Sequence, residues 1–135
     1  MTKERYCSYE VARLLKEKGF NEPVRSLYLI DDAHSNAVNV TYTITYRSVN
    51  SAKAILRPTH QMACDWLMEK DIYISPKYSW FRSRKGAPHY EWKPVILRLS
   101  TFNIIYPQLL DMCEYYKTYG EAVDAAIKYS LENLI

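Results

Sequence analysis

The stretch from residue 77 to residue 98 carries the strongest candidate for binding chemistry in this sequence. It holds six Lys and Arg residues and one Glu, and six minus one gives a local charge of +5. Aromatic residues are interleaved with these cations, and such a pattern can stack on bases while neutralising phosphates. Trp, Tyr and Arg also dominate the energetics of protein interfaces. The predicted binding residues are Trp80, Arg82, Arg84, Lys85, Tyr90 and Trp92.

A β-hairpin that turns at residues 84–88 would bring these side chains together. The expected cross-strand pairs are Ser83–His89, Arg82–Tyr90 and Trp80–Trp92. One face of the hairpin would then carry Tyr78, Trp80, Arg82, Tyr90 and Trp92, because side chains alternate along a strand.

This face has three interpretations. It is an aromatic ladder that only stabilises the hairpin, a surface for a protein partner, or a surface for nucleic acid. Pro94 lacks a backbone N–H, which favours an edge strand, and an aromatic edge strand suits a homodimer seam.

Patterns for catalysis are absent from the sequence. Three glycines are too few for a phosphate-cradling loop, and no HExxH, P-loop or GxGxxG motif is present. We therefore predict a protein that is not an enzyme and carries no cofactor. An enzyme whose site is assembled from scattered residues, such as Asp31, His34 and His60, is the alternative that sequence spacing leaves open.

Two residues have the spacing of metal ligands. His60 and Cys64 lie four apart in a predicted helix, so both could reach one ion. A structural zinc site needs four ligands, and no second pair with suitable spacing is visible. We predict no metal site, with Cys64 as a small half-buried side chain and His60 facing solvent.

Three amphipathic helices are predicted, over residues 8–18, 59–70 and 118–133. Each opens on a hydroxyl residue that can cap a helix, namely Ser8, Thr59 and Thr118. Strict alternation over 40–46 predicts a strand, paired in a hairpin with 26–30. Further strands are expected at 54–57, 72–75, 78–82 and 89–101, and a short helix at 108–113. Together these elements predict a single α+β domain over 1–135, with a mainly antiparallel sheet of four to six strands covered on one face by the helices, in the order α-ββ-α-ββ(β)-α.

Composition excludes several classes of protein. The chain has 135 residues, of which 48% are hydrophobic and 24% are charged, so we do not expect disorder. The longest apolar run, residues 27–30, is far too short to cross a membrane. The charged start carries no secretory signal. Three cysteines without a CxxC pair predict reduced thiols and a cytoplasmic location.

Three stretches carry a family resemblance: residues 6–23, 58–67 and 119–135. In amino-acid sequence and in order they resemble a family of small uncharacterised proteins of gut Bacteroidales genomes and their phages or mobile elements. The resemblance implies a cytoplasmic protein linked to mobile elements, and it implies no activity. All three stretches fall on predicted helices, so it bears on the scaffold rather than on residues 77–98.

From the residues we predict a non-enzymatic intracellular binding protein whose partner is another protein or a second copy of itself. A small nucleic-acid-binding protein that uses the hairpin at 77–98 is the alternative. The net charge of +3 is mild for such a role.

Overall fold

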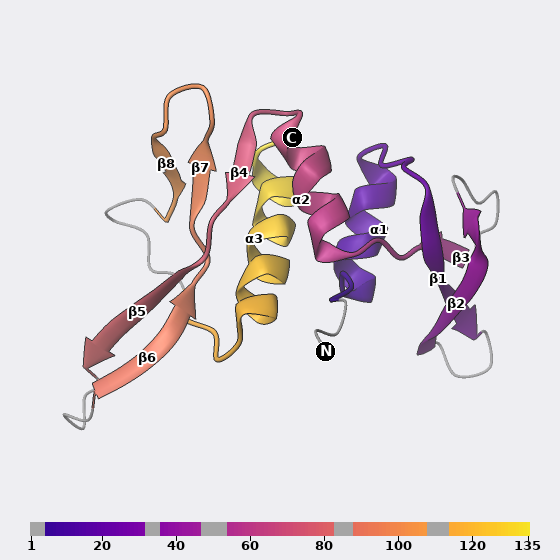
Figure 1. Ribbon diagram of the computed structural model, residues 1–135, viewed down its shortest axis with the longest axis horizontal. Helices are drawn as coiled ribbons and strands as arrows, with labels where there is room; N and C mark the ends of the chain where they lie inside the picture. Colours follow the sequence, from indigo (N-terminus) through magenta and orange to yellow (C-terminus); the bar gives the residue numbers. More distant parts are fainter. Residues whose placement is uncertain (1–4, 32–35, 47–53, 83–87, 108–113) are drawn as a thin grey trace.

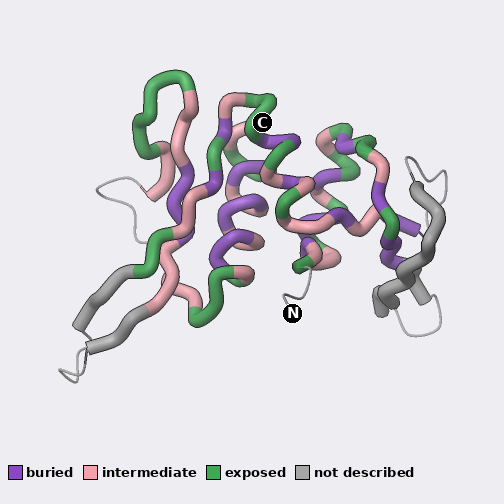
Figure 2. The backbone as a smooth tube through the Cα atoms, viewed as in Figure 1, coloured by how far each residue is buried: buried purple, intermediate pink, exposed green. Residues whose placement is uncertain are grey.

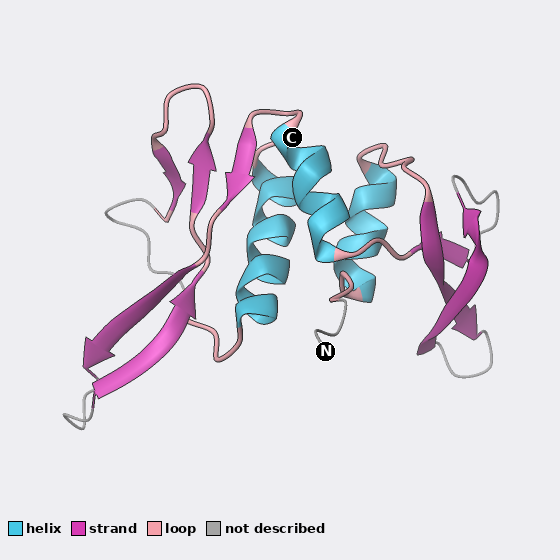
Figure 3. Ribbon diagram, viewed as in Figure 1, coloured by secondary structure: helices cyan, strands magenta, loops and turns pink. Residues whose placement is uncertain are grey.

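A computed structural model of the protein describes residues 5–31, 36–46, 54–82, 88–107 and 114–135 (Figure 1). Three helices lie in the middle of the molecule, with strands on both sides of them (Figure 3). The helices are α1 (Tyr9–Glu17), α2 (His60–Met68) and α3 (Tyr119–Asn133).

Each helix begins where its predicted cap stands. The hydroxyl of Ser8 accepts from Val11 N at 3.3 Å, and that of Thr59 accepts from Met62 N at 3.2 Å. The hydroxyl of Thr118 likewise accepts from the backbone N–H three residues further on, at 3.1 Å. Each bond satisfies a donor that the first turn leaves unpaired. The three predicted helices are therefore confirmed.

The described strands form three small antiparallel sheets. One sheet, in the order β2-β1-β3, contains β1 (Val24–Asp31), β2 (Asn36–Tyr46) and β3 (Ala54–Leu56). A second, in the order β4-β7-β8, contains β4 (Ile72–Ile74), β7 (Ile96–Arg98) and β8 (Ile104–Tyr106). The third is the hairpin of β5 (Lys77–Arg82) and β6 (Pro88–Lys93). The α+β class and the antiparallel pairing are as predicted.

The described strands do not join into the single sheet that the sequence predicts. The helices pack between the β1–β3 sheet and the β4–β7–β8 sheet, so their apolar residues face both ways (Figure 1). The main core cluster draws on all three helices and on strands from both sides, including Val11, Leu67, Ile96, Ile127 and Leu131. Figure 2 shows this buried centre, with exposure increasing toward the turns.

Pro94 marks the point where the long predicted strand 89–101 is divided. The segment is split into β6 and β7, with buried Pro94 and Val95 between them. A residue without an N–H cannot donate to a ladder at this point. We did not predict β8, and the helix expected at 108–113 lies outside the described residues.

The β5–β6 hairpin forms with a register different from the expected one. Trp80 pairs with Tyr90, and Tyr78 pairs with Trp92. The sequence predicts Trp80 opposite Trp92, so the observed register is displaced by two residues. The hairpin leaves the helical body and points away from it (Figure 1).

Among the described residues, every helix is too short or too polar to cross a bilayer.

Candidate functional site

The starts of α1 and α2 are joined backbone to backbone. Tyr6 and Thr59 form an antiparallel bridge. On either side of it, Cys7 N donates to Pro58 O at 3.0 Å and His60 N donates to Arg5 O at 2.8 Å. This short ladder holds the residues before α1 and those at the start of α2 against each other.

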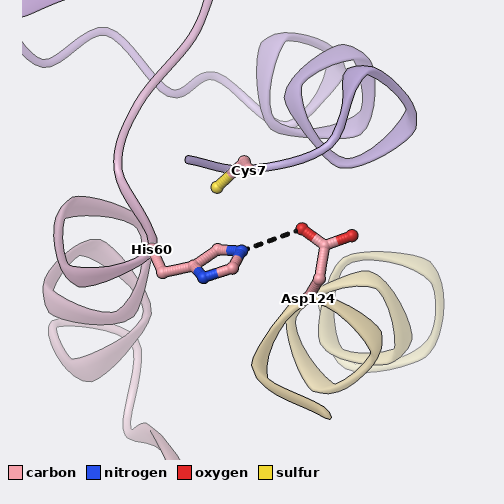
Figure 4. Close-up of side chains that lie close together, drawn as sticks. All are labelled: Cys7, His60 and Asp124. Atoms are coloured by element: carbon pink, nitrogen blue, oxygen red, sulfur yellow. Dashed lines mark hydrogen bonds and ion pairs between the residues drawn. The ribbon is translucent and has the colours of Figure 1, made fainter. Parts of the chain in front are cut away.

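Asp124, in the second turn of α3, ties this pair of helix starts to the third helix. Its Oδ1 accepts from Ser8 N at 3.0 Å and contacts Nε2 of His60 at 3.1 Å. The carboxylate therefore lies at the N-termini of α1 and α2, where the helix dipoles favour a negative charge. Figure 4 shows the two side chains facing each other from their two helices.

Cys7 completes a group that we call the junction cluster: Cys7, His60 and Asp124. The thiol is fully buried and donates to Thr59 O at 3.8 Å. A ring nitrogen of His60, the sulfur and a carboxylate oxygen all lie within 4.8 Å of one another. The three residues come from three separate parts of the chain and meet only in the fold.

The environment sets the protonation of the cluster. Burial, followed by the nearby Asp124 carboxylate, raises the pKa of the Cys7 thiol well above its ordinary value. Burial also acts to raise the pKa of Asp124, but hydrogen bonds from His60 and Ser8 outweigh it and lower that pKa. At neutral pH the cluster therefore contains a neutral thiol and an ionised carboxylate.

This arrangement does not fit nucleophilic catalysis. In a Cys-His-Asp triad, one ring nitrogen faces the nucleophile and the other faces the acid. Figure 4 shows the second nitrogen of His60, Nδ1, on the side of the ring away from both Asp124 and Cys7. That nitrogen is buried and has no hydrogen-bond partner among the described residues. A buried neutral thiol is also a poor nucleophile.

An open pocket of about 420 Å³ lies beside the cluster. His60 and Asp124 line it, while Cys7 is buried and is not among its lining residues. The other lining residues are Tyr6, Ser8, Tyr116, Gly120, Glu121, Ala125 and Lys128. Lys128 is held by Glu10 at 2.9 Å.

The predicted environment of His60 is wrong. The side chain is only 13% exposed and points to Asp124, because the backbone bridge draws the first turn of α2 against the segment before α1. Cys64 is half-buried against the core, as predicted, and burial raises its pKa to about 12. Of the scattered residues considered for an enzyme, His34 lies outside the described residues and the side chain of Asp31 is not described.

A second feature, which we call the aromatic ladder, runs from the base of the hairpin to the start of α3. Tyr78 stacks on Trp92 with ring centroids 5.0 Å apart, and Trp92 meets Tyr119 edge-on at 5.1 Å. The guanidinium of Arg5 lies over the Tyr119 ring at 5.5 Å. A Cβ on Gly120 would meet the Arg5 side chain at 3.2 Å, so glycine leaves room for this contact.

The ladder is anchored at its centre and exposed at its ends. Trp92 exchanges backbone hydrogen bonds with Tyr116, at 2.7 and 2.8 Å. Tyr78 is 59% exposed and Tyr119 is 42% exposed. The ladder therefore presents rings on a fixed backbone.

The structure describes the side chain of only one of the six predicted binding residues, Trp92. Trp92 belongs to the ladder. Trp80, Arg82 and Tyr90 lie on β5 and β6, but their side chains are not among those described. Arg84 and Lys85 lie outside the described residues.

Sequence reasoning missed four residues of these two sites: Arg5, Cys7, Tyr119 and Asp124. The one available signal was that each stands within six residues of a helix cap. Nearness to a cap would have identified these residues only if the convergence of the three helix starts had also been known.

No protein-family model, no curated protein and no solved structure matches this chain. The resemblance to a Bacteroidales family therefore stays a prediction, and the function has to be argued from the two sites themselves.

Proposed function

We propose that this protein is a non-enzymatic cytoplasmic binding protein, and that the aromatic ladder with the adjoining β5–β6 hairpin binds another protein. The observation that carries the proposal is the exposed ring of Tyr78, stacked on Trp92. A stacked ring loses little conformational entropy on binding, since its partner already holds it in place.

Charge at the base of the hairpin supports an acidic partner. Lys77 and Lys93 lie directly opposite each other across the two strands, on the face of the hairpin opposite to Tyr78 and Trp92. Like charges placed in this way destabilise a sheet. Among the residues whose side chains are described, neither lysine forms an ion pair. An acidic segment of a partner would relieve this repulsion.

A protein is favoured over nucleic acid for two reasons. The net charge of the chain is +3, whereas proteins that bind nucleic acid are commonly much more basic. Glu91 also lies on β6, on the face of the hairpin that carries Lys77 and Lys93, where it would repel a phosphate backbone drawn to those lysines. The partner is a different protein or a second copy of this chain.

The cytoplasmic location is also part of the proposal. Cys7 and Cys64 are free thiols, and a reducing compartment preserves such thiols.

A photo-crosslinking residue in place of Tyr78 tests the binding surface directly. The matched control carries the same residue in place of Phe102, which is 80% exposed on the separate β7–β8 turn. In cells of the source organism, we expect irradiation of the position-78 variant to give a discrete protein adduct that the position-102 variant does not give.

Other outcomes of this experiment decide against the proposal. An adduct with nucleic acid at position 78 would establish the alternative function. Identical adducts at both positions, or none at position 78, would overturn the ladder as a binding surface. An adduct with the chain itself would identify the partner as a second copy, which light scattering at increasing concentration then has to confirm.

A further inference from the structure

The junction cluster has a chemistry that the proposed binding function does not use. Its donors are a thiol, an imidazole and a carboxylate, which are the three classes of side chain that bind Zn²⁺ in proteins. They come from the starts of α1 and α2 and from the second turn of α3. We propose that Cys7, His60 and Asp124 bind one Zn²⁺ ion.

The distances suit a tetrahedral ion. Zinc bonds of about 2.0–2.3 Å place neighbouring ligand atoms roughly 3.3–3.8 Å apart. His60 Nε2 and Asp124 Oδ1 are already 3.1 Å apart, and no pair in the cluster exceeds 4.8 Å. The required change is a side-chain adjustment of about an ångström and leaves the helices in place.

The direction of the His60 ring also points to a metal. Cys7 and Asp124 lie toward the same edge of the ring (Figure 4), as donors do when they converge on one ion. Zn²⁺ on Nε2 moves the ring proton to Nδ1. Since Nδ1 is already buried and has no partner in the part of the chain that the structure describes, the ion creates no new unpaired position.

Charge balance further favours a divalent ion. Binding displaces the thiol proton to solvent, and the resulting thiolate and the Asp124 carboxylate together carry two negative charges. Zn²⁺ cancels both, so the half-buried cluster holds no net charge. A thiolate and an imidazole select zinc over Mg²⁺ or Ca²⁺, which require oxygen ligands.

The fourth coordination position would open to the neighbouring pocket. His60 and Asp124 line the pocket of about 420 Å³, and the buried Cys7 is not among its lining residues. Three protein ligands with an open position are the pattern of a zinc site that exchanges water or a small ligand, whereas purely structural sites use four protein ligands.

Titration of the metal-free protein with Zn²⁺, and with Co²⁺ as a spectroscopic substitute, tests the proposal. We expect one ion per chain, a Co²⁺ spectrum with a thiolate charge-transfer band and the absorption of a tetrahedral ion, and a higher Tm in the presence of Zn²⁺. Cys7→Ser should remove the thiolate band and lower the Zn²⁺ affinity by more than the ~10–100-fold that loss of an outer-shell partner costs.

Cys64→Ser is the matched control, since it removes the neighbouring half-buried thiol that lies outside the cluster. It should leave the stoichiometry and the spectrum unchanged. Asp124→Asn covers the case in which Cys7→Ser does not fold, because the amide oxygen still accepts from Ser8 N; this variant should weaken Zn²⁺ binding while it stays helical by circular dichroism. Absence of binding at one ion per chain, or binding that Cys7→Ser and Asp124→Asn leave unchanged, would overturn the proposal.

Discussion

The junction cluster and the aromatic ladder are built from opposite kinds of contact. The cluster brings together residues up to 117 positions apart. Hydrogen bonds from His60 and from Ser8, the latter across 116 positions, hold Asp124 in it. The ladder joins rings that lie along the hairpin base and the start of α3, and its ends are exposed. Changes in the cluster should therefore alter folding, whereas changes in the ladder should alter binding.

The largest effect is expected for Asp124→Ala. This change leaves the Ser8 N–H and the His60 Nε2–H without their acceptor, and a buried unsatisfied donor costs about 1–3 kcal/mol. We expect the free energy of unfolding to fall by ~3 kcal/mol, measured by urea denaturation.

Glu132→Ala, at an exposed position of the same helix, serves as the control and should change stability by less than ~0.5 kcal/mol. Equal effects of the two substitutions would show that the cluster contributes nothing to folding.

The second-largest effect is expected at low pH, where protonation of Asp124 should lower the free energy of unfolding. The pKa of Asp124 is lower in the folded protein than its ordinary value of 3.8. The stabilisation is therefore complete above pH ~4 and is lost as the pH falls through the folded pKa. In Asp124→Asn this part of the acid dependence should disappear when unfolding is followed at a series of pH values. An unchanged acid profile would contradict the assignment.

A smaller effect on folding is expected for Tyr78→Ala in the ladder. The ring is 59% exposed, so its loss removes mainly the stacking on Trp92, worth about 0.5–1.5 kcal/mol. We expect the free energy of unfolding to fall by ~1 kcal/mol, while binding of the cross-linked partner is lost. A loss as large as that of Asp124→Ala would mean that the ladder is structural.

The smallest expected change in the free energy of unfolding is an increase rather than a decrease. Lys77→Glu replaces a repulsive pair with an attractive one opposite Lys93, and cross-strand charge pairs contribute about 0.2–1 kcal/mol. We expect a gain of ~0.5 kcal/mol in thermal or urea unfolding, together with weaker binding of the partner. A variant that is less stable than the wild type would remove the argument for an acidic partner.

Local chemistry made much of the fold predictable. The caps Ser8, Thr59 and Thr118 identified all three helices, and the alternating pattern placed β2 and its hairpin with β1. The aromatic pattern of the hairpin predicted Trp92 as a binding residue, although its partner on β5 is Tyr78 and not the expected Trp80.

The arrangement of the elements could not be predicted in the same way. Amphipathic patterns show that a helix buries a face, but they do not show whether one sheet or two cover it. The junction cluster depends on that arrangement. His60 was assigned to solvent because its partner, Asp124, is 64 residues away.

The bond between Ser8 and Asp124 has a consequence for biosynthesis. A contact that spans 116 residues cannot form on the ribosome until residue 124 has left the exit tunnel. Until then the apolar residues at the start of α1 remain exposed, and exposed apolar surface promotes aggregation. Nascent chains arrested before that length should therefore depend on chaperones, whereas those arrested after it should not.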